Sequence, residues 1–208
     1  MSVTVDDPAG RGMREALLAA ALELFFRQGF PGTSVREVTV ACNVTPGALY
    51  NHFPSKEDLL YTIIERTTAE GSGLVEAALE EAPKDPASQL LALARSSTLY
   101  HTRHRAASLV ASFQYIHLPD EQRERVIARR RQQRIGLERI IDAGVRDGVF
   151  RLPEARGANA GKLAATAIAN LTLRPTEQFG PFPRMSDVRL AEFHAQLALQ
   201  MVGGSAPG

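Results

Sequence analysis

The sequence is poor in cysteine, in aromatic residues and in long apolar runs. Cys42 is the only cysteine among the 208 residues, so no disulfide can form within the chain. No apolar run approaches the roughly 18 residues that a membrane-spanning helix requires. The acidic start, MSVTVDDPAG, has the features of neither a signal peptide nor a transit peptide. These absences favour a cytoplasmic protein with no membrane partner.

The chain also has no large excess of charge of either sign. Its formal net charge of +1 excludes the strongly basic body that is typical of sequence-independent nucleic-acid binding. Residues 1–58 carry five basic and seven acidic residues, so this part is net acidic. If it binds DNA, it must use helix N-termini, hydroxyl groups and a few placed cations, because general phosphate neutralisation is weak.

What the sequence does contain is a succession of helical segments, and no strand-like alternation of apolar and polar residues is convincing. The apolar content of 44% is ordinary for a chain that buries a core. After residue 55, proline, glycine and charged residues bound predicted helices at 56–81, 85–102, 105–116, 119–147, 159–173 and 186–202. A proline-rich loop is predicted at 174–184.

Residues 33–60, TSVREVTVACNVTPGALYNHFPSKEDLL, are the most informative stretch. Ser34 can cap a first short helix. Asn43 tolerates the left-handed backbone that a sharp turn requires. Thr45 then provides a second N-cap, with Pro46 at the first helical position, where its missing N–H is harmless.

A third helix follows directly, because Ser55-Lys56-Glu57-Asp58 resembles a capping box with Asp in place of the usual Glu or Gln. Two short helices at a tight turn, next to further capped helices, are the layout of a DNA-reading helix-turn-helix.

Residues 14–64 resemble the N-terminal DNA-binding domain of the TetR (tetracycline-repressor) family of transcriptional regulators. The matching pattern begins with REALLAAALELFFRQGF, continues through TSV and VTPGALY, and closes with HF and SKEDLL. Two positions depart from it, since Asn43 stands where the family usually has Gly and Thr39 where it usually has Ala. Asn can adopt the turn conformation, and one Thr in a short helix costs little.

The resemblance implies an all-α protein of about nine helices, with an N-terminal three-helix helix-turn-helix domain and a C-terminal helical ligand-binding and dimerisation domain. We expect a disordered N-terminal tail over 1–12, the DNA-binding domain over 13–58, its helix-turn-helix motif over 34–53, the effector-binding and dimerisation domain over 59–203, and a C-terminal tail over 204–208.

From their chemistry and position, the residues expected at double-stranded operator DNA are Arg36, Thr45, Pro46, Gly47, Ala48, Tyr50, Asn51, His52 and Lys56, with Thr33 and Ser34 touching the DNA backbone. Pro46 and Ala48 can contact a thymine methyl group, and Asn51 can hydrogen-bond an adenine edge. Tyr50 and His52 are expected as phosphate ligands, and Lys56 is expected to add a cation near the DNA backbone.

An effector pocket is implied in the C-terminal domain, without any indication of the small molecule that fills it. The residues that combine aromatic surface with polar groups there are Arg95, Thr98, Tyr100, Phe113, Gln114, Tyr115, Thr166 and Asn170. We expect an effector bound among the middle helices to tilt the helix that begins at Lys56, with Gly71-Ser72-Gly73 as the candidate hinge of that helix.

The last two predicted helices favour a homodimer. LAATAIANL is small and apolar, and the final helix has a broad apolar face formed by Leu190, Phe193, Leu197, Leu199 and Met201. In TetR-like proteins the corresponding helices form a four-helix bundle with a second subunit. A two-fold dimer would place its recognition helices roughly 34–36 Å apart, or a multiple of that distance.

Two smaller features have alternative interpretations. Cys42 can be a redox sensor, although a small core residue is favoured. His101 and His104 are three residues apart and His117 follows, which can provide a metal site, but no acidic or thiol ligand accompanies them. The metal-free interpretation is preferred.

A run of arginines at 123–134 can be a second nucleic-acid patch. The alternative is a solvated helix face, because Glu121 and Arg125, and likewise Arg134 and Glu138, are four residues apart and can form ion pairs. We favour the solvated face.

The sequence therefore predicts a homodimeric transcriptional repressor that binds a palindromic operator and is released by a small-molecule effector. A helical enzyme acting on a small molecule is the alternative, but no phosphate loop, nucleophile elbow or zinc motif is present. A DNA-organising protein without an effector is a third possibility, which the acidic first domain opposes. No enzymatic activity, cofactor or metal is expected.

Overall fold

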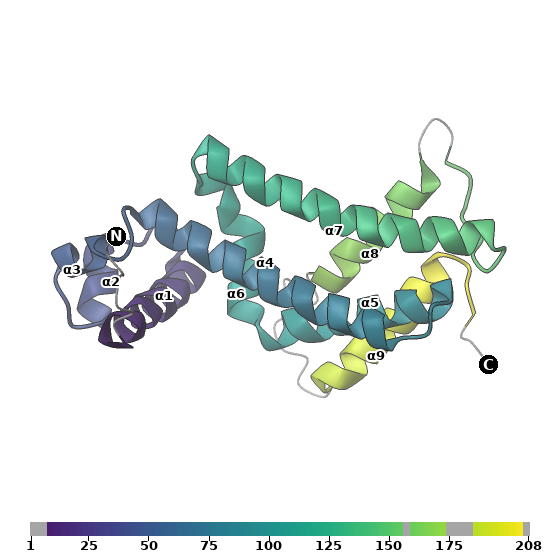
Figure 1. Ribbon diagram of the computed structural model, residues 1–208, viewed down its shortest axis with the longest axis horizontal. Helices are drawn as coiled ribbons and strands as arrows, with labels where there is room; N and C mark the ends of the chain where they lie inside the picture. The colour runs from purple at the N-terminus through teal and green to yellow at the C-terminus, as the bar shows by residue number, and fades with distance from the viewer. Residues whose placement is uncertain (1–7, 156–158, 174–184, 206–208) are drawn as a thin grey trace, which may run out of the picture. The chain divides into compact units, whose positions relative to one another are not determined.

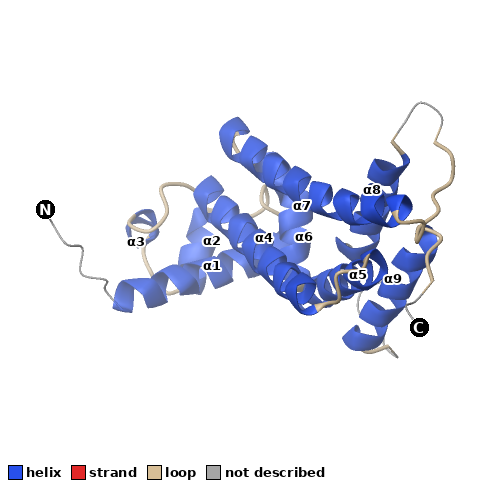
Figure 2. Cartoon of the chain, turned by 45° about the vertical axis from the view of Figure 1, so that its right-hand side comes forward, coloured by secondary structure: helices blue, strands red, loops and turns tan. Residues whose placement is uncertain are grey.

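The computed structural model describes residues 8–155, 159–173 and 185–205, and these ranges contain helices and no strand (Figures 1 and 2). The α-helices are α1 (Pro8–Gln28), α2 (Val35–Ala41), α3 (Pro46–Tyr50), α4 (Lys56–Glu81), α5 (Pro86–Arg103), α6 (Arg105–Gln114), α7 (Asp120–Arg146), α8 (Ala160–Leu173) and α9 (Asp187–Met201). A 3₁₀ helix, η1 (Tyr115–His117), lies between α6 and α7. The all-α prediction and the number of helices are confirmed for the described residues.

The chain forms two compact units. The first unit comprises the residues up to Thr67 together with Leu109–Val126, and the second comprises Thr68–Ser108 and the residues from Ile127 onward. Helices α4, α6 and α7 therefore each contribute residues to both units. The first unit is larger than the expected domain at 13–58, because it extends along α4 to Thr67 and also takes in Leu109–Val126.

The core of the first unit is built on the apolar faces of α1, α3 and α4. Leu17, Ala21 and Phe25 lie at four-residue spacing on α1 and are at most 1% exposed. They pack in one cluster with the buried residues Val38, Leu49, Phe53, Leu59, Leu60 and Ile64. The segment 109–126 completes this cluster with Val110, Ala111, Leu118 and Val126.

The second unit is built around α5, which packs against α8 and α9. Ala94 on α5 and Ala195 and Ala198 on α9 have no exposed surface, and their small side chains allow close helix packing. The same cluster contains Leu90, Leu137, Ile141, Phe150, Ile168 and Leu199. This core fixes one face of α8 and one face of α9.

Most predicted helix ends agree with the structure to within two residues. Helix α4 has the predicted bounds, while the helix predicted at 105–116 is divided into α6 and η1. Helix α1 begins at Pro8, inside the segment expected to be a tail, because proline suits the first turn of a helix. The loop predicted at 174–184 lies outside the described residues. Within those residues, no helix is both long enough and apolar enough to cross a lipid bilayer.

Candidate nucleic-acid interface

Helix α2 begins at a complete capping box, which confirms the predicted cap at Ser34. Ser34 Oγ accepts a hydrogen bond from Glu37 N at 3.2 Å, and Ser34 N donates to Glu37 Oε2 at 2.7 Å. The hydrogen bond from the Ser34 backbone, followed by the one from Gln28, lowers the pKa of the Glu37 carboxyl group. Glu37 is therefore ionised at neutral pH, where the capping box is at full strength.

The turn between α2 and α3 is formed at Asn43. Its φ of 54° is the only positive φ of a non-glycine residue in the described part of the chain. Asn43 N donates to Val40 O at 3.0 Å, and Val44 N donates to Thr39 O at 2.9 Å. The predicted left-handed turn is therefore present, with Asn in the conformation that glycine adopts at lower cost.

Helix α3 is short and well fixed on one side. Thr45 caps it by accepting a hydrogen bond from Ala48 N at 3.3 Å, and Pro46 occupies its first turn. Leu49 is completely buried in the first-unit core, whereas Tyr50 is 52% exposed. The solvent-facing side of α3 is thus held at a fixed orientation by the buried side.

Six of the residues expected at DNA are exposed on α2, on α3 or directly beside α3, and we call this set the reading surface: Arg36, Thr45, Pro46, Gly47, Tyr50 and Asn51. Ser34 is also exposed, and Ala48 and His52 are half-buried beside this surface. Thr33 differs, since it is 2% exposed and its hydroxyl donates to Gly29 O at 2.8 Å.

Lys56 has partners within the protein. Its ammonium donates to Phe30 O at 2.9 Å and to Thr33 O at 2.8 Å. The same nitrogen lies 4.0 Å from the centroid of the Phe30 ring. The expected cation at the start of α4 is present, but it faces the loop between α1 and α2.

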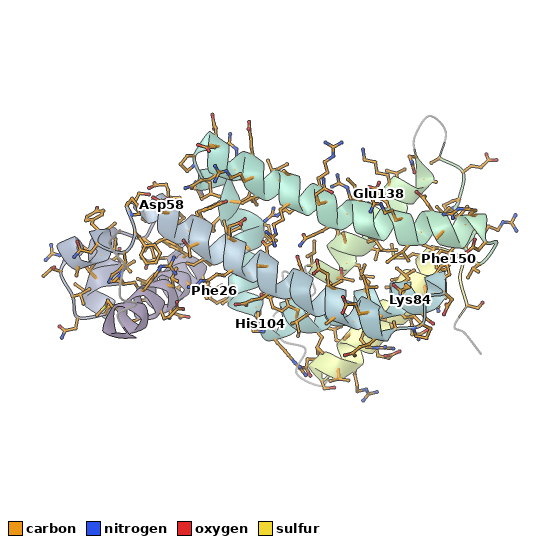
Figure 3. The ribbon with its side chains drawn as sticks, viewed as in Figure 1. Phe26, Asp58, Lys84, His104, Glu138 and Phe150 are labelled. Carbon is orange, nitrogen blue, oxygen red and sulfur yellow. The ribbon has the colours of Figure 1, made fainter. Side chains whose placement is uncertain are left out.

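The third helix of the motif begins as predicted. Ser55 Oγ accepts a hydrogen bond from Asp58 N at 3.0 Å and donates to Asp58 Oδ2 at 2.7 Å. The second oxygen of Asp58 accepts a hydrogen bond from Gln122 Nε2 at 2.8 Å. Asp58 is labelled among the side chains of Figure 3. Its carboxylate therefore joins the start of α4 to the start of α7 within the first unit.

Two features of the first unit were not expected from the sequence. Val40 on α2 is 68% exposed, and it lies three residues before Asn43. Gln114 was expected in the effector pocket, but its Oε1 accepts a hydrogen bond from Phe30 N at 3.1 Å. No local sequence pattern indicates a contact across 84 positions.

The residues expected in the effector pocket do not form one group. Thr98 is completely buried, with its Oγ1 3.3 Å from His194 Nδ1, and Tyr100 OH donates to Glu70 Oε2 at 3.2 Å. Burial raises the pKa of the Tyr100 phenol, and the negative charge of Glu70 adds to the effect. Arg95 is exposed and forms an ion pair with Glu192 at 2.7 Å.

The remaining expected pocket residues lie elsewhere. Phe113, Gln114 and Tyr115 belong to the first unit. Thr166 and Asn170 are on the exposed side of α8.

An open groove of about 480 Å³ lies between the end of α4 and α5 in the second unit. Its lining residues are Ala78, Glu81, Ala82, Pro83, Ser88, Leu91, Ala92, Arg95, Ser96 and Leu99. Of the residues expected in the effector pocket, Arg95 is the one that lines this groove.

The three histidines considered as metal ligands make other contacts. His101 Nδ1 is 2.9 Å from Ser108 Oγ, and the His104 ring, labelled in Figure 3, stacks on Tyr100 at a centroid distance of 4.6 Å. His117 stacks on Phe30 at 5.5 Å. Across the described ranges, no group of three His, Cys, Asp or Glu residues is placed to hold a metal ion.

The arginine run on α7 includes both predicted ion pairs. Arg125 Nη2 is 2.5 Å from Glu121 Oε1, and Arg134 Nε is 3.4 Å from Glu138 Oε1. Cys42 is half-buried, and this burial raises the pKa of its thiol. A protonated thiol is a poor nucleophile at neutral pH, which favours the packing role of Cys42 over the redox role.

The helix-turn-helix and the helical second unit both have matches among known families. Residues 17–62 match the family model described as bacterial regulatory proteins, tetR family. Residues 83–202, more than half of the chain, match the model described as tetracyclin repressor-like, C-terminal domain. The chain belongs to the TetR family. It is a transcriptional regulator with a DNA-binding helix-turn-helix.

Individual TetR-family proteins agree with this assignment. The chain is 29% identical to the transcriptional repressor KstR2 of Rhodococcus jostii strain RHA1 over an alignment of 156 residues. This alignment covers 70% of this chain and 72% of KstR2. A TetR-family regulatory protein from Rhodococcus RHA1 superposes with a TM-score of 0.83 at 27% identity, over 94% of this chain and 98% of that one.

Another similar structure contains bound molecules. AibR in complex with isovaleryl coenzyme A and operator DNA superposes with a TM-score of 0.79, over 93% of this chain and 100% of that one. The sequence identity is 23%, so this comparison shows only that the two chains share a fold.

Proposed function

We propose that this protein is a homodimeric repressor that binds a palindromic operator through α2 and α3 and is released by a small-molecule effector. The observation that carries the proposal is the geometry of α3. Its caps and its buried Leu49 fix the helix, while its other side is open to solvent. A rigid, exposed helix start is suited to the major groove.

The reading surface has the chemistry for base and phosphate contacts. At the start of α3 the Thr45 hydroxyl, which accepts from Ala48 N, can donate its own proton to a phosphate, and the exposed Asn51 can pair with an adenine edge. Arg36 is the only charged side chain on the reading surface. The electrostatic contribution of phosphate contacts to the affinity for one half-site is therefore small. A dimer raises the overall affinity because it binds two half-sites at once.

Dimerisation is supported by apolar side chains that the second unit leaves in solvent. On α8, Leu163 is 54% exposed, and on α9, Val188 and Phe193 are 55% and 58% exposed. The opposite faces of both helices are buried in the second-unit core. Apolar exposure on two neighbouring helices is typical of an interface with a second copy.

The effector is expected in the second unit, among α4 to α8. AibR, which has the same fold, holds isovaleryl coenzyme A and operator DNA in one complex. In this chain α4 contributes to both units, so a ligand that shifts α4 can change the position of the first unit. To move the population from mostly bound to mostly released, the ligand needs about 5.5 kcal/mol of preference for the released state. No observation favours an enzyme, and we propose no catalytic role.

The experiment that tests this function is selection of fragments from the organism's own genome by the purified protein at physiological salt. We expect a few palindromic sites to be recovered. Asn51→Ala should bind them about tenfold or more weakly, since one good base contact contributes about 1–3 kcal/mol. Gln132→Ala, at an exposed position on α7, is the matched control and should bind normally.

Two results would contradict the proposal. One is recovery of no site at all. The other is broad binding to all DNA that is lost as salt increases, which would indicate a non-specific DNA-organising protein.

A further inference from the structure

The loop between α1 and α2, residues 29–33, has its carbonyl groups bound by side chains. Gly29 O accepts from Thr33 Oγ1 at 2.8 Å, and Gly32 O accepts from Gln28 Nε2 at 3.0 Å. Phe30 O and Thr33 O both accept from Lys56 Nζ, at 2.9 and 2.8 Å. Lys56 comes from the first turn of α4, so this helix holds the loop directly.

The N–H side of the same loop is held from another part of the chain. Phe30 N donates to Gln114 Oε1 at 3.1 Å, from the last residue of α6. The Phe30 ring stacks on His117, which follows in η1. Side chains from α4 and α6 thus bind opposite polar groups of one residue, Phe30.

Two of the three N–H donors of Lys56 are taken by backbone carbonyl groups in this arrangement, and the Phe30 ring covers the same nitrogen. An ammonium group has three N–H donors and no acceptor. Two of them point to the carbonyl groups of Phe30 and Thr33, and the nitrogen also lies 4.0 Å above the Phe30 ring. Lys56 is half-buried there. A cation in the first turn of a helix is also opposed by the helix dipole, and the two carbonyl oxygens offset this repulsion.

We propose that Lys56 and Gln114 are positioning residues for operator reading, and that Lys56 does not contact the DNA phosphates. The loop that they hold leads directly to Ser34, the N-cap of α2, and α2 packs against α3. Fixing the loop fixes the start of α2, and through it the reading surface. This inference rests on the proposed operator binding.

Acetylation by an N-hydroxysuccinimide ester, followed by peptide mass spectrometry, tests the contact in the unaltered protein. The chain has three lysines, Lys56, Lys84 and Lys162. Lys162 is exposed on α8 of a single copy and serves as the fast reference, and its rate is measured at a protein concentration low enough for monomers, because the neighbouring Leu163 belongs to the proposed interface. Lys84 donates to Leu79 O at 2.7 Å and to Glu80 O at 3.0 Å but is exposed. Its acetylation rate therefore measures how far two carbonyl acceptors slow the reaction when the lysine is not buried.

Lys56 should react at least about tenfold more slowly than Lys162, because the hydrogen bonds of its ammonium must open first. Addition of the selected operator should not change its rate. A Lys56 that reacts as fast as Lys162 and becomes protected by the operator would overturn the proposal. The acetylation rates measured without DNA do not depend on an operator. They still test the position of Lys56 if the protein turns out not to bind operator DNA.

Operator affinity as a function of salt provides the second test. Lys56→Met and Gln114→Leu should each weaken operator binding about tenfold, with an unchanged slope of log affinity against log salt. Arg36→Met removes an exposed cation of the reading surface. It should reduce the slope by about 0.9 for each phosphate that Arg36 neutralises.

A slope reduced in the same way by Lys56→Met would identify a phosphate ligand and overturn the proposal. Lower thermal stability with unchanged operator affinity would show a merely structural role, which also overturns it. If Lys56→Met does not fold, the acetylation rates and Gln114→Leu still decide between the two roles.

Discussion

Asn43 is the residue on which the turn before α3 depends, since its φ of 54° is unfavourable for residues other than glycine. Asn43→Gly should leave the free energy of unfolding unchanged or raise it slightly. Asn43→Val should lower it by about 1–2 kcal/mol, because a β-branched side chain is strained in this region. Chemical denaturation of the two variants measures the difference. Equal stability would mean that the turn adapts to the side chain.

His101 is the residue that should make stability depend on pH. Burial, followed by the nearby charge of His104, lowers its pKa to about 4 from the usual 6.5. The unfolded chain therefore takes up a proton below about pH 6.5, whereas the folded chain does not until about pH 4. Stability should fall as the pH decreases through this window, by up to about 3 kcal/mol. Burial lowers the pKa of His194 too, which acts in the same direction.

Denaturation curves between pH 7 and pH 4 check this expectation. His101→Gln keeps a polar partner for Ser108 and has no titrating group, so its stability should fall less steeply. Identical slopes for both proteins would show that His101 does not titrate differently in the folded state.

At the scale of a single element, α4 contains two glycines with opposite surroundings. A Cβ atom at Gly71 would lie 2.9 Å from Tyr100 Cε1, whereas one at Gly73 would meet nothing within 4 Å. Gly73→Ala should raise the free energy of unfolding by about 1 kcal/mol through helix propensity. Gly71→Ala should lower it, because the Tyr100 ring must move. Urea denaturation separates the two, and equal stabilisation would show that the ring moves freely.

The same pair of variants tests the hinge suggested for Gly71-Ser72-Gly73. If this segment bends during induction, Gly73→Ala should reduce the response of operator binding to effector while stabilising the fold. An unchanged response of both variants would exclude the hinge.

Elements defined by neighbouring residues could be predicted from the sequence, and elements defined by distant ones could not. The caps at Ser34 and Thr45 and the turn at Asn43 follow from local side-chain chemistry, and all three are present. Gln114 carries no such local signal, because the N–H that it binds is 84 positions away. Lys56 was expected beside a DNA phosphate, and nothing in its sequence neighbours indicates that its ammonium binds the carbonyl groups of Phe30 and Thr33.

For the whole molecule, the exposed apolar faces of α8 and α9 lead to a prediction about assembly. Phe193→Asp should shift the protein from dimer to monomer in sedimentation equilibrium, because a charge would be buried in the interface. Ile116→Asp is the matched control, since Ile116 is also 58% exposed but belongs to the first unit. It should remain dimeric. Two variants with the same assembly state would exclude α9 as the interface.

The composition of the first unit also has a consequence for modularity. The family match to the DNA-binding part ends at residue 62, yet the core around α1 and α4 is completed by Val110, Ala111, Leu118 and Val126. A gene fusion that joins the first 62 residues to the body of another regulator would leave part of that core without its partners. DNA specificity in this protein should therefore be exchanged between relatives by grafting side chains of the reading surface, while recombination at the sequence boundary yields poorly folded chimaeras.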